Sequence, residues 1–140
     1  MHTATLPILG RTAHVSIPAL GLHDSIARVD TGAFGGALHA KVHGVIEEKG
    51  KRYLRFSVFD GVHPGTTERI FQIETFTQKR VRSAHGQVEM RYKIPLTLVI
   101  NGQSVTTEVG ITDRSTMKHS FLLGRAAIAG NFLIDVSKEI

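Results

Sequence analysis

The segment Ile26-Ala27-Arg28-Val29-Asp30-Thr31-Gly32-Ala33 joins a short apolar strand to an acidic residue and a turn. Such a strand delivers the Asp30 carboxylate to the turn, where Gly32 permits a sharp bend and close backbone approach. The Thr31 hydroxyl is expected to hold the loop by a hydrogen bond to the backbone. If two such loops meet about a two-fold axis, their carboxylates share one proton, because like charges so near cannot both ionise. The ionised carboxylate can then activate water while the protonated one polarises a carbonyl group.

Asp-Thr-Gly is also an ordinary turn sequence. By average composition, such a tripeptide occurs by chance in roughly 2–3% of chains of this length. The interpretation of the motif therefore depends on its context.

The sequence around the motif predicts mostly β-structure. Apolar and polar residues alternate along it, and Asn-Gly at residues 101–102 predicts a hairpin turn. The pattern predicts strands over residues 13–17, 25–29, 51–59, 67–82, 88–100, 104–112 and 132–136. Only residues 37–41 and 125–130 have a locally helical pattern. Short strands separated by Gly and Asn turns favour a single all-β domain over residues 1–140, closed or sandwiched.

Composition is that of a globular domain, with 140 residues, 41% hydrophobic and 21% charged. The absence of cysteine excludes disulfides and thiolate metal sites, and it fits a reducing, cytoplasmic location. No basic, apolar leader and no apolar run of about 18 residues is present, so neither a cleaved signal nor a membrane span is expected. The net charge of +5 leaves an acidic substrate open. Nucleic acid is not expected as a partner, because the basic residues are dispersed and only 6% of residues are aromatic.

A second motif near the C-terminus gives the Asp-Thr-Gly loop its context. Residues 121–125 read Phe-Leu-Leu-Gly-Arg and precede the second helical segment. The two motifs together resemble the retropepsins, single-domain aspartic peptidases that work as homodimers. A closer resemblance is to the bacterial and archaeal family labelled ATP-dependent zinc proteases, also called RimB-like. The matching segments keep their order and comprise residues 29–33, 37–40, 82–86, 89–91, 112–117 and 122–125.

This resemblance implies a retropepsin-like closed β-barrel with one or two short helices. It also implies a homodimer that hydrolyses peptide bonds with Asp30, Thr31 and Gly32 from both chains. The family's link to glutamate ligases implies an acidic or polyglutamyl peptide substrate, whose carboxylates arginine forks would bind. The candidate substrate-binding residues are Ala33, His39, Arg82, Ser83, Arg91 and Arg114. His39 is equally interpretable as a packed core histidine, and the arginines as charges on solvated strand faces.

The glycine-bearing loop at residues 83–87 lies between two predicted strands. In retropepsins a hairpin of this kind forms a flap over the substrate, and Gly86 would be its flexible point. The alternative is an ordinary surface hairpin, since most loops carry no function.

Two parts of the family label lack support in the residues. His39 and His43 are four apart, but Gly44 and the neighbouring β-branched residues disfavour a helix that would place both on one metal. The glycines at 32, 35 and 36 are followed by no lysine, so no phosphate-binding loop is present. We therefore expect hydrolysis without metal, ATP or any other cofactor.

Phe34 departs from both family patterns. The RimB-like sequences commonly have a basic residue after Asp-Thr-Gly-Ala, and retroviral members have an aspartate that pairs with the arginine of the Gly-Arg step. Here Phe34 leaves Arg125 without that partner. The departure keeps an alternative open, namely a non-catalytic retropepsin-fold module for peptide binding or dimerisation.

Overall fold

The computed structural model describes residues 5–60, 67–82 and 84–140 of the chain, and its regular structure is almost entirely β. The strands are β1 (Ile8–Leu9), β2 (Thr12–Ile17), β3 (Leu22–Val29), β4 (Gly36–Glu48), β5 (Lys51–Phe59), β6 (Glu68–Ile73), β7 (Thr77–Arg82), β8 (Val88–Ile100), β9 (Gln103–Thr112), β10 (Phe121–Leu123) and β11 (Leu133–Ile134). Within these ranges the helices are a 3-10 turn, Pro18–Leu20, and α1, Arg125–Ile128. None of the helices in the described residues is long and apolar enough to cross a membrane.

The short strand β10 closes a barrel because it pairs along both of its edges. Phe121 lies beside Ala27 in the parallel pairing with β3, and beside Leu38 in the antiparallel pairing with β4. From β3 the hydrogen-bonded path continues through β2, β8, β9 and β4, and so returns to β10. The predicted all-β closed barrel is therefore confirmed.

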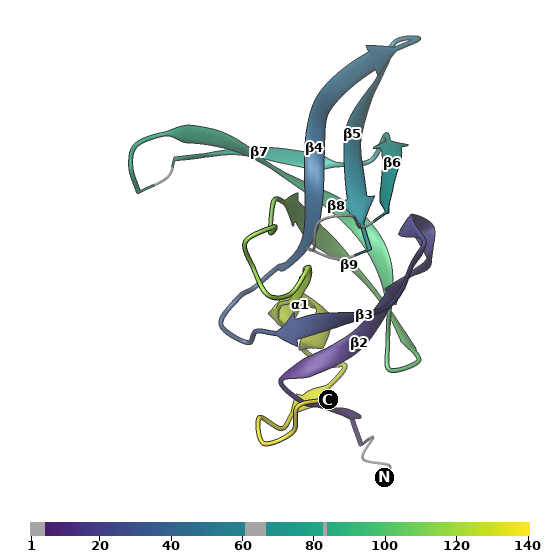
Figure 1. The fold of residues 1–140 in the computed structure, drawn as a ribbon, viewed down its shortest axis with the longest axis vertical. Helices are drawn as coiled ribbons and strands as arrows, with labels where there is room; N and C mark the ends of the chain where they lie inside the picture. Colours follow the sequence, from purple (N-terminus) through teal and green to yellow (C-terminus); the bar gives the residue numbers. More distant parts are fainter. Residues whose placement is uncertain (1–4, 61–66, 83) are drawn as a thin grey trace.

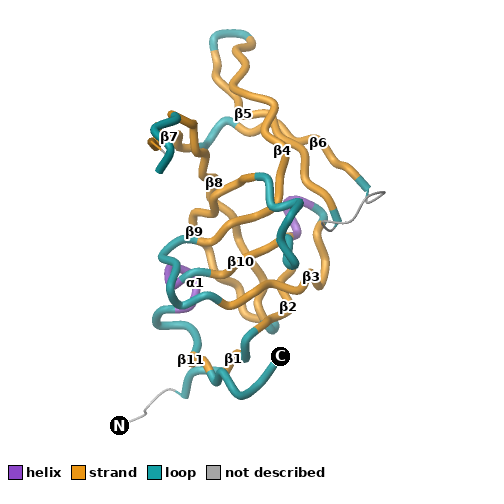
Figure 2. Tube along the Cα trace, turned by 60° about the vertical axis from the view of Figure 1, so that its left-hand side comes forward, coloured by secondary structure: helices purple, strands orange, loops and turns teal. Residues whose placement is uncertain are grey.

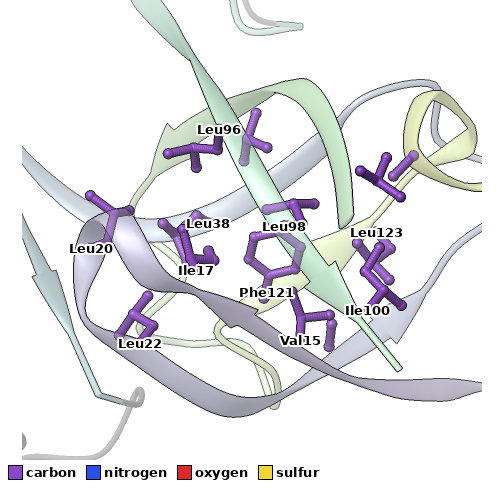
Figure 3. Close-up of a cluster of buried hydrophobic side chains, with 14 of the residues drawn as sticks. Val15, Ile17, Leu20, Leu22, Leu38, Leu96, Leu98, Ile100, Phe121 and Leu123 are labelled. Carbon is purple, nitrogen blue, oxygen red and sulfur yellow. The ribbon is translucent and has the colours of Figure 1, made fainter. Parts of the chain in front are cut away.

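The barrel interior is filled by aliphatic side chains and one phenylalanine, Phe121 (Figure 3). Apart from Leu20 of the 3-10 turn, the labelled side chains come from alternate positions of the barrel strands, as expected when one face of each strand is buried. The side chains labelled in the figure are those of Val15, Ile17, Leu20, Leu22, Leu38, Leu96, Leu98, Ile100, Phe121 and Leu123. Since β10 contributes Phe121 and Leu123, the same packing fixes the segment that leads into the Gly-Arg step.

Two projections leave the barrel (Figure 1). The outer half of β4 continues beyond the barrel and pairs with β5, which in turn pairs with β6. The second projection is the hairpin of β7 and β8, whose outer part extends away from the barrel on another side. Arg69 of β6 anchors the first projection, because its Nη1 donates to the carbonyl of Gly21 at 2.9 Å and to Asp60 Oδ1 at 3.0 Å.

The short strands β1 and β11 lie together below the barrel (Figure 2). There β1 and β11 pair in parallel, and the last residues return along the start of β2. The backbone N–H groups of Arg11 and Thr12 donate to the carbonyls of Lys138 and Glu139 at 2.8 and 2.7 Å. This return places the C-terminal residues beside β2 and β3.

The strands predicted over residues 51–59 and 88–100 match β5 and β8, and the short helix expected after residue 124 is α1. Residues 37–41 were wrongly predicted to be helical, because they belong to β4 and pair with β9 and β10. The single stretch predicted over residues 67–82 is divided into β6 and β7. The last strand is also shorter than predicted, since β11 covers only Leu133–Ile134.

Candidate active site

Asp30 follows directly after β3, and its backbone is fixed by the strand that closes the barrel. Its N–H donates to the carbonyl of Leu123 in β10 at 2.9 Å. The carboxylate Oδ1 accepts the N–H of Gly32 at 2.9 Å. A Cβ on residue 32 would lie 3.1 Å from that oxygen, so glycine allows this close approach. The side chain is half-buried, and one of its two oxygens is thus held by the turn.

The Gly-Arg step at residues 124–125 packs directly against the Asp30 loop. The N–H of Arg125 donates to the carbonyl of Ala33 at 2.8 Å, and the N–H of Ala126 donates to that of Phe34 at 2.8 Å. A Cβ on Gly124 would lie 2.5 Å from the carbonyl oxygen of Gly35. Two backbones can approach so closely only where one of them lacks a side chain. The two motifs that stand 94 residues apart in sequence therefore form one structural unit.

Arg125 supports this unit in a way that differs from the retroviral aspartate pair. Its Nη1 donates to the carbonyl of Thr31 at 2.8 Å. Its guanidinium carbon lies 5.9 Å from the centroid of the Phe34 ring, a cation–π contact. Phe34 is otherwise open to solvent, with 67% of its surface exposed. Thr31 thus contributes its carbonyl to the loop, whereas the sequence predicted a role for its hydroxyl.

His39 is buried on β4, with 8% of its surface exposed, and its ring stacks on Phe59 at 5.1 Å between centroids. Its Nδ1 accepts the backbone N–H of Arg114 at 2.9 Å, which places the proton of the neutral ring on Nε2. Burial lowers the pKa of His39, although the nearby Asp113 carboxylate opposes this effect. His39 lines a cavity of about 530 Å³ with Phe59 and Tyr92. Its predicted place among the substrate-binding residues stays a prediction.

The arginines predicted to clamp substrate do not converge on one point. In the β7–β8 hairpin Arg82 pairs with Val88, and Arg91 pairs with Lys79. Because side chains alternate between faces along a strand, Arg82 and Arg91 lie on opposite faces of the hairpin. Arg91 Nη2 donates to Glu89 Oε1 at 3.3 Å.

Arg91 nevertheless lines a cavity of about 420 Å³ that also contains Gly35, Gly36 and Ala37. Arg91 therefore lies near the segment that follows the Asp30 loop. No contact of Arg82 with that segment occurs among the described residues. Ser83, the remaining predicted binding residue of the hairpin, lies outside the described residues.

Arg114 has a structural partner within its own loop. Its Nε donates to the carbonyl of His119 at 3.2 Å, and its backbone N–H donates to His39. Burial, and then the charge of Arg28, lower the pKa of Arg114. This arginine therefore shapes the loop between β9 and β10. Arg28 and His119, which interact with it, and Lys118 beside His119 were not among the predicted site residues.

The hairpin expected to act as a flap is present as β7 and β8, and Gly86 in its turn has a positive φ of 81°. Glycine adopts this left-handed conformation without the strain that a side chain would bring. The interpretation of the hairpin as a flap over Asp30 stays a prediction.

Comparison with known proteins connects this geometry to a family. The family model described as "Retropepsin-like aspartic endopeptidase RimB" matches residues 8–140. A probable alpha-L-glutamate ligase of Parasynechococcus marenigrum is 35% identical over 132 residues, covering 91% of this chain and 28% of the relative. One of Shewanella halifaxensis is 30% identical over 136 residues, covering 94% of this chain and 29% of the relative. The chain thus spans less than a third of these ligases.

A solved structure has the same fold. The protein Lpg0085 of Legionella pneumophila, described as of unknown function, superposes with a TM-score of 0.73. It is 27% identical, and the match covers 96% of both chains. The barrel and the surrounding strands are therefore shared over nearly the whole length.

Proposed function

This chain belongs to the RimB-like family of retropepsin-like aspartic endopeptidases, and from that premise we propose that it hydrolyses peptide bonds as a homodimer. The observation that carries the proposal is the Asp30 loop. It presents one carboxylate at the end of β3, tied to β10 through Leu123 and to the Gly-Arg step through Arg125. A single Asp-Thr-Gly motif supplies one carboxylate, so a second copy of the chain must supply the other.

The proposed chemistry follows from two Asp30 carboxyl groups that share one proton. Gly32 holds Oδ1 of each group, which leaves Oδ2 to face its counterpart and a water molecule. The ionised Asp30 takes a proton from the water molecule while the water oxygen attacks the scissile carbonyl carbon. At the same time the protonated Asp30 gives its proton to the carbonyl oxygen. Collapse of the tetrahedral intermediate breaks the C–N bond, and the amine leaves with the proton that the first carboxylate had taken. As the carbonyl group re-forms, one hydroxyl group of the intermediate returns its proton to the second Asp30, which restores the shared proton. Neither metal nor ATP takes part in these steps.

We further propose that the substrate is an acidic, glutamate-containing peptide. The net charge of +5 supports this class, because an overall positive field attracts acidic ligands. The relatives named as probable alpha-L-glutamate ligases support it too, since the product of such an enzyme would carry glutamate residues. Under this proposal the domain acts on a peptide of the kind that a ligase makes.

The test compares the wild type with Asp30→Asn on matched peptides, one rich in glutamate and one with glutamine in its place. We expect the wild type to cleave the glutamate peptide, also in EDTA, and Asp30→Asn to cleave neither. Loss of turnover in EDTA that zinc restores would contradict the metal-free mechanism. Binding by the wild type without cleavage of any peptide would instead identify a non-catalytic binding module.

A further inference from the structure

A cationic pocket lies directly beside the Asp30 strand. Its volume is about 660 Å³, and its lining comes from four separate segments of the chain. Arg11 directly precedes β2, Arg28 lies on β3, and Lys118 with His119 lies in the loop before β10; the fourth segment is Glu139 with Ile140. Val29, which precedes Asp30, also lines the pocket. The pocket therefore begins one residue from the proposed catalytic carboxylate.

The basic groups of this pocket are close enough to act on one another. Burial lowers the pKa of His119, and the charges of Lys118, Arg28 and Arg114 lower it further. Arg28 also lowers the pKa of the adjacent Arg114. Like charges gathered in this way disfavour one another unless an anion is bound between them.

Protein carboxylates do little to balance this charge. The ion pairs within the described ranges involve His39, Lys51, Arg69 and Arg91, and none of them includes a basic residue of the pocket. Glu139 also lines the pocket, and its carbonyl accepts hydrogen bonds from the backbone and hydroxyl of Thr12. Glu139 is the acidic side chain in the described lining, and Arg11, Arg28 and Lys118 outnumber it, so the lining side chains have a net positive charge.

We propose that this pocket, through Arg28 above all, binds a glutamate side chain of the substrate close to the bond that is cleaved. The identity of the ligand, a glutamate-containing peptide, rests on the proposed function. The pocket adds the place where one glutamate of that peptide is bound. Arg28 lies on β3 two residues before Asp30, which is about 7 Å at the rise of an extended chain. An extended peptide has a similar rise per residue, so the bound glutamate lies within about two residues of the scissile bond.

The chemistry of the walls favours a carboxylate on an aliphatic chain. Besides its basic groups, the pocket presents Ile26, Val29 and Ile140, which suit the methylene groups of a glutamate side chain. Among the residues that the structure describes, its lining contains no Phe, Tyr or Trp on which a nucleotide base could stack. An arginine fork can donate hydrogen bonds to both oxygens of a carboxylate, whereas a neutral glutamine side chain offers one amide oxygen and no charge.

The binding test uses Asp30→Asn as the background, because this protein keeps the loop but cannot turn over the peptide. Fluorescence anisotropy measures the affinity for a labelled glutamate-rich peptide and for its glutamine counterpart. We expect Arg28→Gln to weaken binding of the glutamate peptide about ten- to a hundredfold. Lys118→Gln, on an exposed loop, should weaken it about two- to fivefold. Neither change should affect the glutamine peptide.

The matched control is Arg55→Gln, which removes the same charge from an exposed position on β5. The inference is overturned if Arg28→Gln has no more effect than Arg55→Gln, or if both peptides lose affinity equally. It is also overturned if a DNA oligonucleotide of equal charge binds as tightly and depends equally on Arg28. If the wild type cleaves no peptide but binding of the glutamate peptide still depends on Arg28, the proposed function is contradicted. The assignment of the pocket as a glutamate site then stands.

Discussion

At the scale of single residues, Gly124 decides whether the two motifs of the active site can meet. A methyl group at this position would lie 2.5 Å from the carbonyl oxygen of Gly35 and 2.6 Å from that of Phe34. Both are backbone atoms, so the loops must separate to accommodate it. We expect Gly124→Ala to lower the free energy of unfolding by about 1–3 kcal/mol, measured by urea denaturation. Gly35→Ala is the matched control, since a methyl group there meets nothing within 4 Å. An equal cost for both variants would contradict this account.

The buried His39 should make the free energy of unfolding decrease as the pH falls below 6.5. Burial lowers its pKa in the folded protein below the ordinary value of 6.5. As the pH falls below 6.5, the unfolded chain therefore takes up a proton that the folded chain does not, and stability is lost until the folded pKa is reached. His119, whose pKa is also lowered, acts in the same direction.

We expect the free energy of unfolding to be smaller at pH 5 than at pH 7, and His39→Gln to reduce that difference. Urea denaturation at the two pH values measures the effect. His14→Gln, which removes an exposed histidine from β2, is the control and should leave more of the difference in place than His39→Gln does. If the two variants show the same pH dependence, the buried imidazole is not its source.

At the scale of elements, the β7–β8 hairpin has the features of a movable part. Among the described strands β7 pairs with β8 alone, and most of its residues are exposed. Strands with one partner and little buried surface open at low free-energy cost. If the hairpin is a flap, adding the glutamate peptide to Asp30→Asn should slow amide hydrogen exchange in residues 77–82 and 88–91. The outer part of β5, residues 51–54, should exchange at an unchanged rate and so serves as the internal control. Unchanged exchange in the hairpin at saturating peptide would identify it as an ordinary surface hairpin.

The elements that sequence predicted well are those with a strong local signal. Strand β8 has a long run of alternation, and it ends at Asn101-Gly102, where both residues have positive φ values of 48° and 82°. Residues 37–41, by contrast, are rich in helix formers such as Ala37 and Leu38. Their strand state depends on pairing with β9 and β10, which a local pattern cannot reveal.

The difference between local and long-range signals also explains which parts of the site the sequence revealed. Asp30 and the Gly-Arg step were recognised because each is a contiguous motif. The cationic pocket was missed because Arg11, Arg28 and Lys118 lie in three segments that only the closed barrel brings together. One weak signal for the pocket was present in the sequence, namely the charged Arg28 two positions before Asp30. Its side chain alternates with those of Ala27, which is buried, and Val29, which is half-buried.

At the scale of the whole molecule, the proposed mechanism requires that two copies each contribute Asp30. This requirement can be tested by mixing wild-type chains with Asp30→Asn chains under conditions that allow subunits to exchange. The asparagine can still accept the hydrogen bond from Gly32, so mixed dimers should form as readily as the parent dimers.

If an active unit needs two aspartates, activity follows the square of the wild-type fraction, because random pairing gives that share of doubly wild-type dimers. At a fixed total concentration, an equimolar mixture should therefore keep about a quarter of the wild-type rate. A single chain that worked alone would keep about half. Asp24→Asn, which makes the same change at an exposed position on β3, is the control, and its mixtures should keep the full rate. A linear dependence on the wild-type fraction in the Asp30→Asn series would contradict a shared dyad, whatever the oligomeric state in solution, because each Asp30 would then act without its counterpart.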